Sequence, residues 1–438
     1  MNVYNYPQSI DIPTNQNLTE LLHTTARPSS DVSRHVIFED DLEGRSLTLE
    51  QLRDTAGKLA SGLSGAFNPA DQSRWAVILP NSVTIVEAVH AILWLGGVAC
   101  PINHQLLPSE IAHALTVCKP TYIIAYGKIA GRVEDAISVV RQNEERDFTS
   151  PTPLGVPHYD DTRSCLATIH QSSGTTGLPK GVGLSQYNYI SNVYELWKHD
   201  PERWNAEESM LCITPMVHLA NGTDASSLAV DRNAPYHHKT RPTTVQMLPS
   251  ILLGVLDVRK ITGAHGGLKE SEREALFGQG KWQSLQMYGL TEAGPWVAVQ
   301  RVSDDLAVGQ LGHGVDAPSG GPGELWIKGP NITEGYIDNP EANKNAFPEN
   351  GWFNTGDICS ISTDGIYNSF QVSPNELEVY IGRHPAAKDT ELPTGYIAPT
   401  DIHEQVDRQV SGYKRLRGGV WRSLKFRAMQ LQRSLGRI

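Results

Sequence analysis

The residues with the clearest capacity for chemistry lie between Gln171 and Val182. They read Gln-Ser-Ser-Gly-Thr-Thr-Gly-Leu-Pro-Lys-Gly-Val and combine hydroxyls, glycines and one lysine. Glycine tolerates positive φ, so the backbone of such a loop can turn several N–H groups toward one point. A concave row of N–H groups binds an anion, and hydroxyls and an ammonium add charge-assisted donors. The stretch therefore predicts a loop that holds a chain of phosphates.

Two other interpretations of this loop are weaker. A Walker A loop has glycine directly before its lysine, whereas here Pro179 precedes Lys180. A flexible Ser/Gly linker rarely ends in Pro-Lys-Gly-Val, and this loop runs between apolar stretches at residues 166–169 and 182–184. The phosphate loop remains the favoured interpretation.

The helices and strands that must position this loop alternate along the chain. Thr48 and Gln51 form a capping box before a run of apolar residues at helical spacing. We expect helices at residues 49–63, 83–95, 108–117 and 187–199, and strands at residues 75–79, 98–102, 121–126 and 323–329. This alternation predicts an α/β fold with a parallel sheet and helices on its faces. The charged, Pro-rich residues 130–165 are expected to form a surface connection.

Length, composition and charge limit the class of protein. The 438 residues suffice for one large domain and a small one, and 39% apolar with 19% charged residues is ordinary for a soluble globular chain. The formal net charge of −11 argues against nucleic acid as a partner. The longest apolar run, residues 83–100, contains Glu87 and His90, so we expect a buried helix and no transmembrane segment. Nothing in the sequence indicates an oligomeric state.

Cysteine usage and the chain ends bear on localisation. The five cysteines lie far apart, without the spacing of a metal site or a disulfide framework. The N-terminus carries no apolar leader, which favours a reducing intracellular compartment. The last residues, Gly-Arg-Ile, are not a peroxisomal address of the Ser-Lys-Leu type. The expected localisation is therefore intracellular, either cytoplasmic or peroxisomal.

Two more polar stretches follow the loop in order. Residues 286–294 read Gln-Met-Tyr-Gly-Leu-Thr-Glu-Ala-Gly, and residues 355–357 read Thr-Gly-Asp. With the loop, they resemble the adenylate-forming superfamily of acyl- and aryl-CoA synthetases, luciferases and peptide-synthetase adenylation domains. The likeness extends along most of the chain, including Gly335-Tyr336, and is strongest to synthetases of the 4-coumarate–CoA ligase type.

The resemblance implies a role for each matching residue. In that family the loop clamps the β- and γ-phosphates of ATP, which here assigns Ser172, Ser173, Gly174, Thr175, Thr176, Gly177 and Lys180. Tyr288 stacks on the adenine next to Gln286, Thr291 contacts the α-phosphate, Glu292 and Thr176 hold Mg²⁺, and Asp357 accepts the ribose hydroxyls. Lys180, Thr291 and Glu292 are the implied catalytic residues.

Elementary chemistry supports these roles. A carboxylate that attacks the α-phosphorus of ATP must approach a polyanion, and a divalent cation bridging phosphate oxygens offsets that repulsion. Hard oxygen ligands such as Glu292 suit Mg²⁺. An ionised Asp357 can accept two hydroxyl hydrogens at once, which asparagine would do poorly.

The acid-binding region is less well defined. Residues 215–218, Pro-Met-Val-His, resemble a segment whose histidine borders the acyl pocket, although a packed core histidine is an equally good interpretation of His218. Residues 261–268 resemble the small-residue segment behind the adenine, and His265 and Gly266 are assigned there to the substrate site. Residues 222–249 are shorter than the family's acyl-pocket wall, and their pair His237-His238 indicates a solvated loop more than a metal site.

The resemblance breaks in three places near the C-terminus. The family's hinge, with its arginine, is missing after Tyr367, and Ser369 stands where a glycine is expected. A strand is missing after Pro385. After residues 413–420 the chain enters a basic tail without the Ser-Gly-Lys loop whose lysine drives adenylation. The tail is interpreted either as an amphipathic helix or as misread or degenerate coding sequence.

The resemblance implies a large domain at residues 1–365 and a small, truncated α+β domain at residues 366–438. It also implies an acid–CoA ligase that uses ATP, Mg²⁺ and coenzyme A as cofactors and a small carboxylic acid as substrate. The missing arginine and lysine leave two alternatives open. One is a nucleotide-binding relic without turnover, and the other is a stand-alone adenylation domain.

Overall fold

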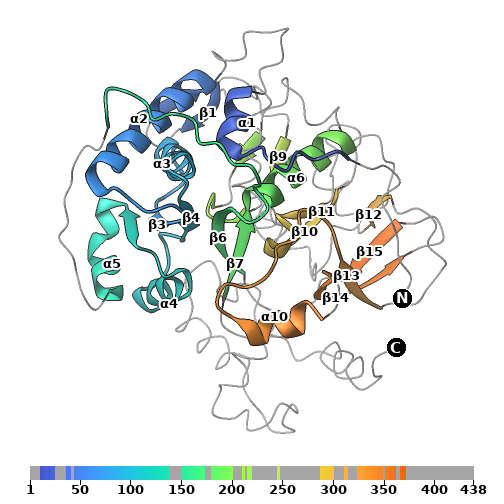
Figure 1. The fold of residues 1–438 in the computed structure, drawn as a ribbon. Coiled ribbons are helices and arrows are strands. Elements are labelled where there is room, and N and C mark those ends of the chain that lie inside the picture. The colour runs from blue at the N-terminus through green and yellow to red at the C-terminus, as the bar shows by residue number, and fades with distance from the viewer. Residues whose placement is uncertain are drawn as a thin grey trace.

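The fold is described by a computed structural model of the chain (Figure 1). It describes residues 10–24, 36–40, 44–137, 149–172, 179–200, 210–212, 215–219, 244–246, 287–299, 310–313, 323–348, 351–361 and 366–370. Most of the predicted small domain, residues 371–438, lies outside these ranges, so its fold stays a prediction.

A five-stranded sheet forms the centre of the N-terminal half. Its strand order is β5-β3-β4-β6-β7. The strands are β3 (Arg74–Ile78), β4 (Val98–Pro101), β5 (Tyr122–Ala125), β6 (Leu166–Ser172) and β7 (Lys180–Ser185). β3 runs parallel to β4 and β5, and β4 runs parallel to β6. β7 pairs antiparallel with β6, so the predicted parallel sheet is a mixed one.

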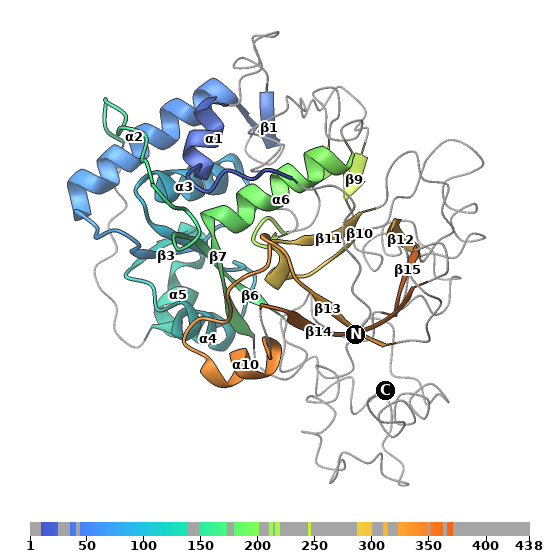
Figure 2. The ribbon, with the colours of Figure 1, turned by 45° about the vertical axis from the view of Figure 1, so that its right-hand side comes forward.

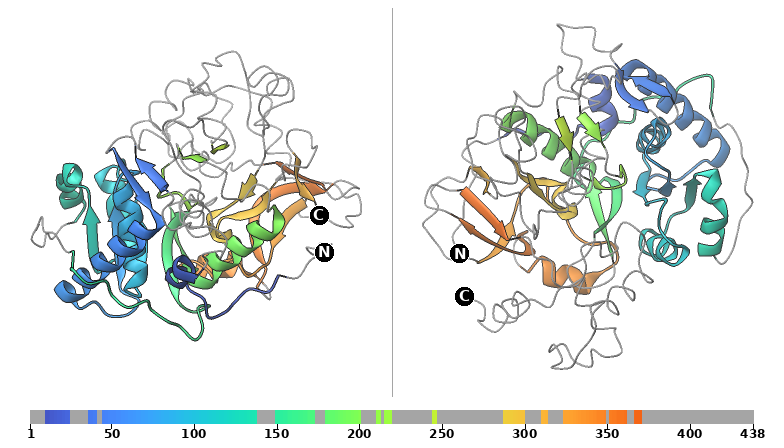
Figure 3. Two further views of the ribbon diagram at one scale, coloured as in Figure 1. Left: turned by 90° about the horizontal axis from the view of Figure 1, so that it is seen from above. Right: turned by 180° about the vertical axis from the view of Figure 1, so that it is seen from behind.

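Helices cover both faces of this sheet (Figures 1 and 3). They are α2 (Leu49–Phe67) and α3 (Val83–Trp94) on one face, and α4 (Pro108–Cys118) and α5 (Ala130–Ala136) on the other. Successive side chains of a strand point to opposite faces. Accordingly Trp75 and Val77 pack into the cluster of α2 and α3, and Ala76 and Ile78 pack into the cluster of α4 and α5. The predicted α/β class is confirmed.

Capping boxes fix where two of the helices begin. The Gln51 N–H donates to Thr48 Oγ1 at 3.1 Å and the Thr48 N–H donates to Gln51 Oε1 at 2.8 Å, as the sequence predicts for α2. Helix α6 (Gln186–His199) begins in the same way. There the Asn188 N–H donates to Ser185 Oγ and the Ser185 N–H donates to Asn188 Oδ1. The predicted helices and strands between residues 48 and 199 are confirmed to within a few residues.

The C-terminal half adds antiparallel sheets beside α6 (Figure 2). A hairpin pairs β10 (Met287–Gly289) with β11 (Trp296–Val299), and the 3₁₀ turn η3 (Thr291–Ala293) lies between them. A four-stranded sheet has the order β12-β15-β14-β13. Its strands are β12 (Gln310–His313), β13 (Gly323–Ile327), β14 (Phe353–Ile361) and β15 (Ile366–Phe370). β15 therefore continues the sheet past the boundary predicted at residue 365.

Shorter elements complete the described fold. They are α1 (Leu18–Thr24), β1 (Val36–Asp40), β2 (Arg45–Thr48), η2 (Gly127–Ile129), β8 (Met210–Cys212), β9 (Thr244–Gln246) and α10 (Pro340–Ala346). β1 pairs antiparallel with β2, and β8 pairs parallel with β9. Within the described residues, no helix combines the length and apolar character that crossing a membrane requires.

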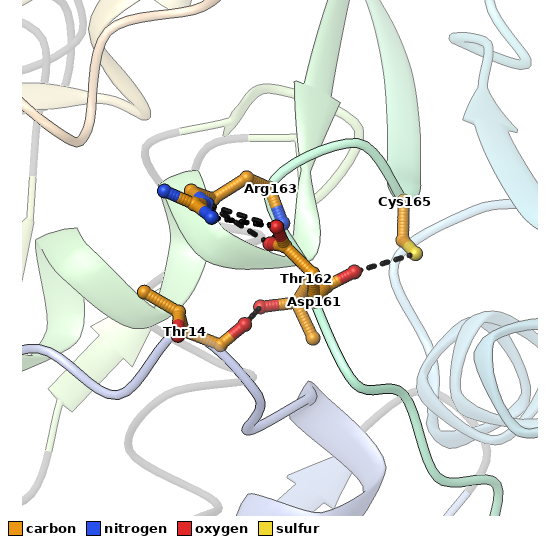
Figure 4. Close-up of polar contacts among 5 residues, drawn as sticks. All are labelled: Thr14, Asp161, Thr162, Arg163 and Cys165. Atoms are coloured by element: carbon orange, nitrogen blue, oxygen red, sulfur yellow. Dashed lines mark hydrogen bonds and ion pairs between the residues drawn. The ribbon is translucent and has the colours of Figure 1, made fainter.

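The predicted surface connection, residues 130–165, includes helix α5, and its described residues 149–165 are mostly exposed or partly exposed and lead into β6. Thr162 attaches this connection to the N-terminal segment (Figure 4). The Thr162 N–H and hydroxyl both donate to the Thr14 carbonyl, at 2.7 and 2.8 Å. The exposed neighbour Asp161 pairs with Arg163, and these hydrogen bonds lower the pKa of the Asp161 carboxyl to about 2. The connection is thereby tied to the N-terminal segment directly before β6 enters the sheet.

Candidate active site

The β6–β7 hairpin brings together the two ends of the predicted phosphate loop. Ser172, the last residue of β6, is paired in register with Lys180, the first residue of β7. His113 of α4 contacts the Pro179 carbonyl through Nε2 at 2.9 Å, which ties the end of the loop to the sheet's helical layer. The hydroxyl of Ser172 is buried and has no hydrogen-bond partner of ordinary geometry among the described residues.

A segment from the C-terminal half lies against the edge of β7. Tyr336 forms a β-bridge with Val182, and the Ile337 N–H donates to the Gly181 carbonyl at 2.8 Å. β7 accepts this neighbour because it carries glycine where the segment packs. A Cβ on Gly183 would lie 2.6 Å from Ile337 Cδ1. The sequence Lys-Gly-Val-Gly thus allows a distant segment to reach the loop.

Thr333 connects β7 to the turn that carries Glu292. Its side chain is only 3% exposed, and its hydroxyl contacts the Gly183 carbonyl in a short hydrogen bond. Its backbone N–H donates to the Glu292 carbonyl at 2.9 Å. One residue therefore fixes the spacing between the phosphate-loop strand and η3.

Two buried asparagines, Asn188 on α6 and Asn331 in the segment after β13, hold the same region. Asn188 donates through Nδ2 to the carbonyls of Pro330 and Ile332, at 2.8 and 3.0 Å. Asn331 donates through Nδ2 to the Ala293 carbonyl at 2.8 Å. Buried amides that satisfy backbone carbonyls in this way give a segment a single position. The η3 turn is therefore set by α6 and by residues 329–333.

Glu292 is a buried carboxylate, with 7% of its surface exposed. Tyr336 donates its hydroxyl hydrogen to Glu292 Oε1 at 2.9 Å. Burial raises the pKa of the Glu292 carboxyl above its ordinary value. Hydrogen bonding from the backbone and from Tyr336, the nearby Ser172 hydroxyl and the Lys180 ammonium lower that pKa by smaller amounts. Burial outweighs these contacts, so the Glu292 carboxylate would gain further from a cation.

Lys180 lies over the ring of Tyr336, with Nζ 4.7 Å from the ring centroid. An ammonium at that distance is attracted by the negative face of the ring. Lys180, Glu292 and Tyr336 thus form one cluster beside the two ends of the phosphate loop.

Tyr288 and Asp357, predicted to contact adenine and ribose, meet in the structure. The Tyr288 hydroxyl donates to Asp357 Oδ2 at 2.7 Å. Burial raises the pKa of the Asp357 carboxyl, and this hydrogen bond lowers it by less. Gly356, at φ +75°, turns the chain, and the Asp357 N–H donates to Thr355 Oγ1 at 3.1 Å. The Thr-Gly-Asp stretch therefore lies at an irregularity in the pairing of β14 with β13, and its carboxylate accepts from Tyr288.

His218 lies on a short turn at residues 215–219. His218 is exposed to solvent, and desolvation by the neighbouring protein still lowers the pKa of its imidazole. Met216 and Leu219 on either side are buried, so the turn packs through its apolar residues and not through His218. The packed-core interpretation of His218 is therefore wrong.

A buried histidine in β6 supports that turn. His170 contacts the Val217 carbonyl through Nδ1 at 3.3 Å and the Tyr189 hydroxyl through Nε2 at 3.1 Å. The Tyr189 hydroxyl also contacts Thr168 Oγ1 at 2.8 Å. Because a carbonyl only accepts, the proton of the neutral ring belongs on Nδ1. Burial lowers the pKa of His170 to about 4, so the ring is neutral near pH 7.

The structure thus brings together Ser172, Lys180 and Glu292, and separately Tyr288 and Asp357. Thr291 begins the η3 turn beside Glu292 and is half-buried. The predicted site residues outside the described part of the chain are Ser173, Gly174, Thr175, Thr176, Gly177, Gln286, His265 and Gly266.

Tyr336 and Thr333 were not predicted as site residues. The pair Gly335-Tyr336 keeps the family's order, which was the one signal that pointed to Tyr336.

A divalent cation at this cluster would rest on few protein ligands. Among the described residues, no group of three or more His, Cys, Asp and Glu side chains could enclose a metal ion. Mg²⁺ usually binds through one or two carboxylates together with waters and substrate phosphates. The single buried Glu292 fits that pattern, and it would need phosphate oxygens to complete the coordination.

Comparison with known proteins bears on the family. A family model described as AMP-binding enzyme matches residues 26–230. The chain is 25% identical to 4-coumarate–CoA ligase-like 3 of Arabidopsis thaliana over 94% of this chain and 91% of that protein. These matches show that the chain is similar to proteins of the adenylate-forming superfamily.

Two further proteins show the same similarity, one in sequence and one in structure. The peroxisomal OPC-8:0-CoA ligase 1 of Arabidopsis thaliana is 26% identical over 94% of this chain and 91% of its own length. An o-succinylbenzoate CoA synthetase structure from Bacillus subtilis, bound to a product analogue, has a TM-score of 0.71. It is 18% identical and covers 92% of this chain and 94% of its own, so this likeness shows the superfamily's α/β fold.

Proposed function

We propose that this chain is an ATP-dependent acid–CoA ligase. In the first step a carboxylate oxygen attacks the α-phosphorus of ATP, forming an acyl–phosphate bond and breaking the bond to pyrophosphate. In the second step the thiol of coenzyme A attacks the acyl carbonyl, loses its proton and displaces AMP. The AMP-binding family and the CoA-ligase relatives support the general chemistry.

The observation that carries the proposal is the cluster of Lys180, Glu292 and Tyr336 beside the ends of the phosphate loop. There the buried Glu292 carboxylate accepts from the Tyr336 hydroxyl, and the Lys180 ammonium lies over the ring of the same tyrosine. A preorganised ammonium stabilises the negative charge that develops as pyrophosphate leaves, and a cation held by the carboxylate would act in the same way. Burying the Glu292 carboxylate costs free energy, and binding a cation there would offset that cost.

Each residue has a role in this proposal. Lys180 and the loop residues Ser172 to Gly177 bind the β- and γ-phosphates, and Thr291 contacts the α-phosphate. Asp357, oriented by Tyr288, accepts the ribose hydroxyls. Glu292 and Thr176 would hold Mg²⁺, which would neutralise the phosphate oxygens. His218, exposed on its turn, borders the acid.

The test is ATP–pyrophosphate exchange with a panel of aryl and fatty acids. We expect exchange with at least one acid, and a CoA thioester when coenzyme A is added. A preparation shown to be folded by circular dichroism that exchanges with none of the acids would overturn the proposal. Exchange without thioester formation would instead indicate a stand-alone adenylation domain.

A second candidate is a nucleotide-binding relic without turnover. The sequence lacks the hinge arginine and the Ser-Gly-Lys lysine. Ser369, at the position of an expected hinge-side glycine, is paired with Cys359 inside β15 and β14. Loss of a positioned charge costs roughly a hundred- to a thousand-fold in rate. Calorimetry with ATP and with an acyl-AMP mimic separates the candidates, because tight binding without exchange favours the relic.

A further inference from the structure

Tyr336 uses different parts of its side chain for two opposite charges. Its hydroxyl donates to Glu292 Oε1 at 2.9 Å, and its ring face lies 4.7 Å from Lys180 Nζ. The residue itself is only 7% exposed. A buried tyrosine between a carboxylate and an ammonium can therefore orient both without carrying a charge itself.

The backbone around Tyr336 leaves it a single position. Its N–H donates to Asn343 Oδ1 at 2.6 Å, and its carbonyl accepts from Asn343 Nδ2 at 2.9 Å. Gly335 before it has φ +147°, and a Cβ there would lie 2.7 Å from Asn343 Oδ1. The β-bridge to Val182 fixes the other side. This over-determined position is what a residue that aims two other side chains requires.

The tyrosine is a donor at every ordinary pH. Burial and the adjacent Glu292 carboxylate raise the pKa of Tyr336 far above its usual value. The phenol therefore keeps its proton, and the hydrogen bond favours the charged form of Glu292. Without that bond, burial would raise the pKa of Glu292 further.

We propose that Tyr336 is a positioning residue of the nucleotide site, whose hydroxyl aims the Glu292 carboxylate and whose ring holds the Lys180 ammonium for the phosphates. This proposal rests on the function proposed above. It divides the side chain into two separable parts. The hydroxyl acts on metal-dependent binding through Glu292, and the ring acts on phosphate binding through Lys180.

Two variants separate these parts. Tyr336→Phe keeps the ring and removes the hydroxyl, and Tyr336→Leu removes both. Isothermal titration with ATP is carried out once with Mg²⁺ and once with EDTA. We expect Tyr336→Phe to weaken binding about ten-fold with Mg²⁺ and less than about two-fold with EDTA. Tyr336→Leu is expected to weaken binding a further two- to five-fold or so under both conditions.

A double variant gives an independent readout. The Tyr336 hydroxyl donates to Glu292 Oε1 at 2.9 Å, so its effect on binding should depend on the carboxylate. In a Glu292→Gln background, Tyr336→Phe is expected to change ATP binding with Mg²⁺ by less than about two-fold.

Tyr194→Phe is the matched control. It removes a tyrosine hydroxyl on α6 that donates to Gln16 Oε1 at 3.0 Å. It is expected to bind ATP like the wild-type chain. If Tyr336→Phe binds ATP with Mg²⁺ as tightly as the control, the positioning role is overturned and the proposed function stands. If the wild-type chain does not bind ATP at all, the proposed function fails, and this role fails with it.

Discussion

At the scale of residues, the candidate site combines the buried carboxylate of Glu292 with the ammonium of Lys180, which lies over the ring of Tyr336. Burial raises the pKa of Glu292 by more than its hydrogen bonds and the Lys180 charge lower it. Asp357 is in a similar state, with Tyr288 as its hydrogen-bond donor. Both carboxylates are therefore poised to gain from an incoming group, a cation at Glu292 and hydroxyl donors at Asp357.

Asp357→Asn tests the ribose end of the site. Asparagine keeps the shape but offers one acceptor oxygen in place of two, and its amide would face hydroxyl donors. We expect ATP affinity to fall about ten-fold. Titration with 2′,3′-dideoxy-ATP is the control, because it lacks the ribose hydroxyls. If the substitution weakens ATP and the dideoxy analogue equally, Asp357 does not act on the ribose.

At the scale of elements, the site is the meeting point of segments far apart in sequence. The β6–β7 hairpin supplies Lys180, η3 supplies Glu292, and the segment before α10 supplies Tyr336. Thr333 and the two asparagines hold these segments in register through backbone carbonyls. The geometry of the candidate site is therefore held by polar contacts behind it as well as by the side chains within it.

Thr333→Val tests that support. Valine has nearly the same shape but leaves the Gly183 carbonyl without the Thr333 hydroxyl. We expect the free energy of unfolding in urea to fall by about 1–3 kcal/mol. Thr333→Ser, which keeps the hydroxyl, is expected to lose less. Equal losses in the two variants would mean that packing, and not the hydrogen bond, makes Thr333 important.

Gly183→Ala tests the close approach at the edge of β7. Its Cβ would lie 2.6 Å from Ile337 Cδ1, and such overpacking costs about 1–3 kcal/mol. Gly65→Ala in the exposed part of α2 is the control, because a Cβ there meets no atom within 4 Å. It is expected to stabilise the protein by roughly 0.5–1 kcal/mol. Urea unfolding of both variants measures the contrast, and a stabilised Gly183→Ala would contradict the packing.

The sequence predicted the elements better than their pairing. Capping boxes and apolar spacing identify α2 and the strands that follow, because those signals are local. The sheet was predicted to be parallel, but β7 makes it a mixed one. Residues 173–179 between β6 and β7 are fewer than the dozen or more that a parallel connection needs. The contact of Tyr336 with Glu292 spans 44 residues, and no local pattern carries it. The shape of the loop at Ser173–Gly177 stays a prediction.

At the scale of the whole molecule, the described core buries titratable groups that charge on acidification. His90 and His170 are both buried, and burial lowers their pKa values from 6.5 to about 4. In the unfolded chain they take up protons at higher pH than in the folded protein. The free energy of unfolding is therefore expected to fall as the pH drops from about 6.5 to 4, by up to roughly 3 kcal/mol for each histidine.

His90→Leu isolates one of these two groups. Both ring nitrogens of His90 lack a hydrogen-bond partner among the described residues, so an apolar replacement leaves no partner unsatisfied. Urea unfolding between pH 7 and pH 4.5 is expected to show a shallower loss of stability in this variant. His158→Gln, at an exposed histidine paired with Glu20, is the control. An unchanged slope in His90→Leu would contradict the buried, neutral imidazole.

The central claim is that ATP binds along the phosphate loop with Lys180 on its phosphates. The most direct measurement is the equilibrium affinity for ATP of Lys180→Gln, compared with Lys58→Gln, which removes a partly exposed lysine paired with Asp54 on α2. We predict that ATP affinity falls about ten-fold or more in Lys180→Gln and does not change in Lys58→Gln. An ATP affinity in Lys180→Gln equal to that of the wild-type chain would contradict the account.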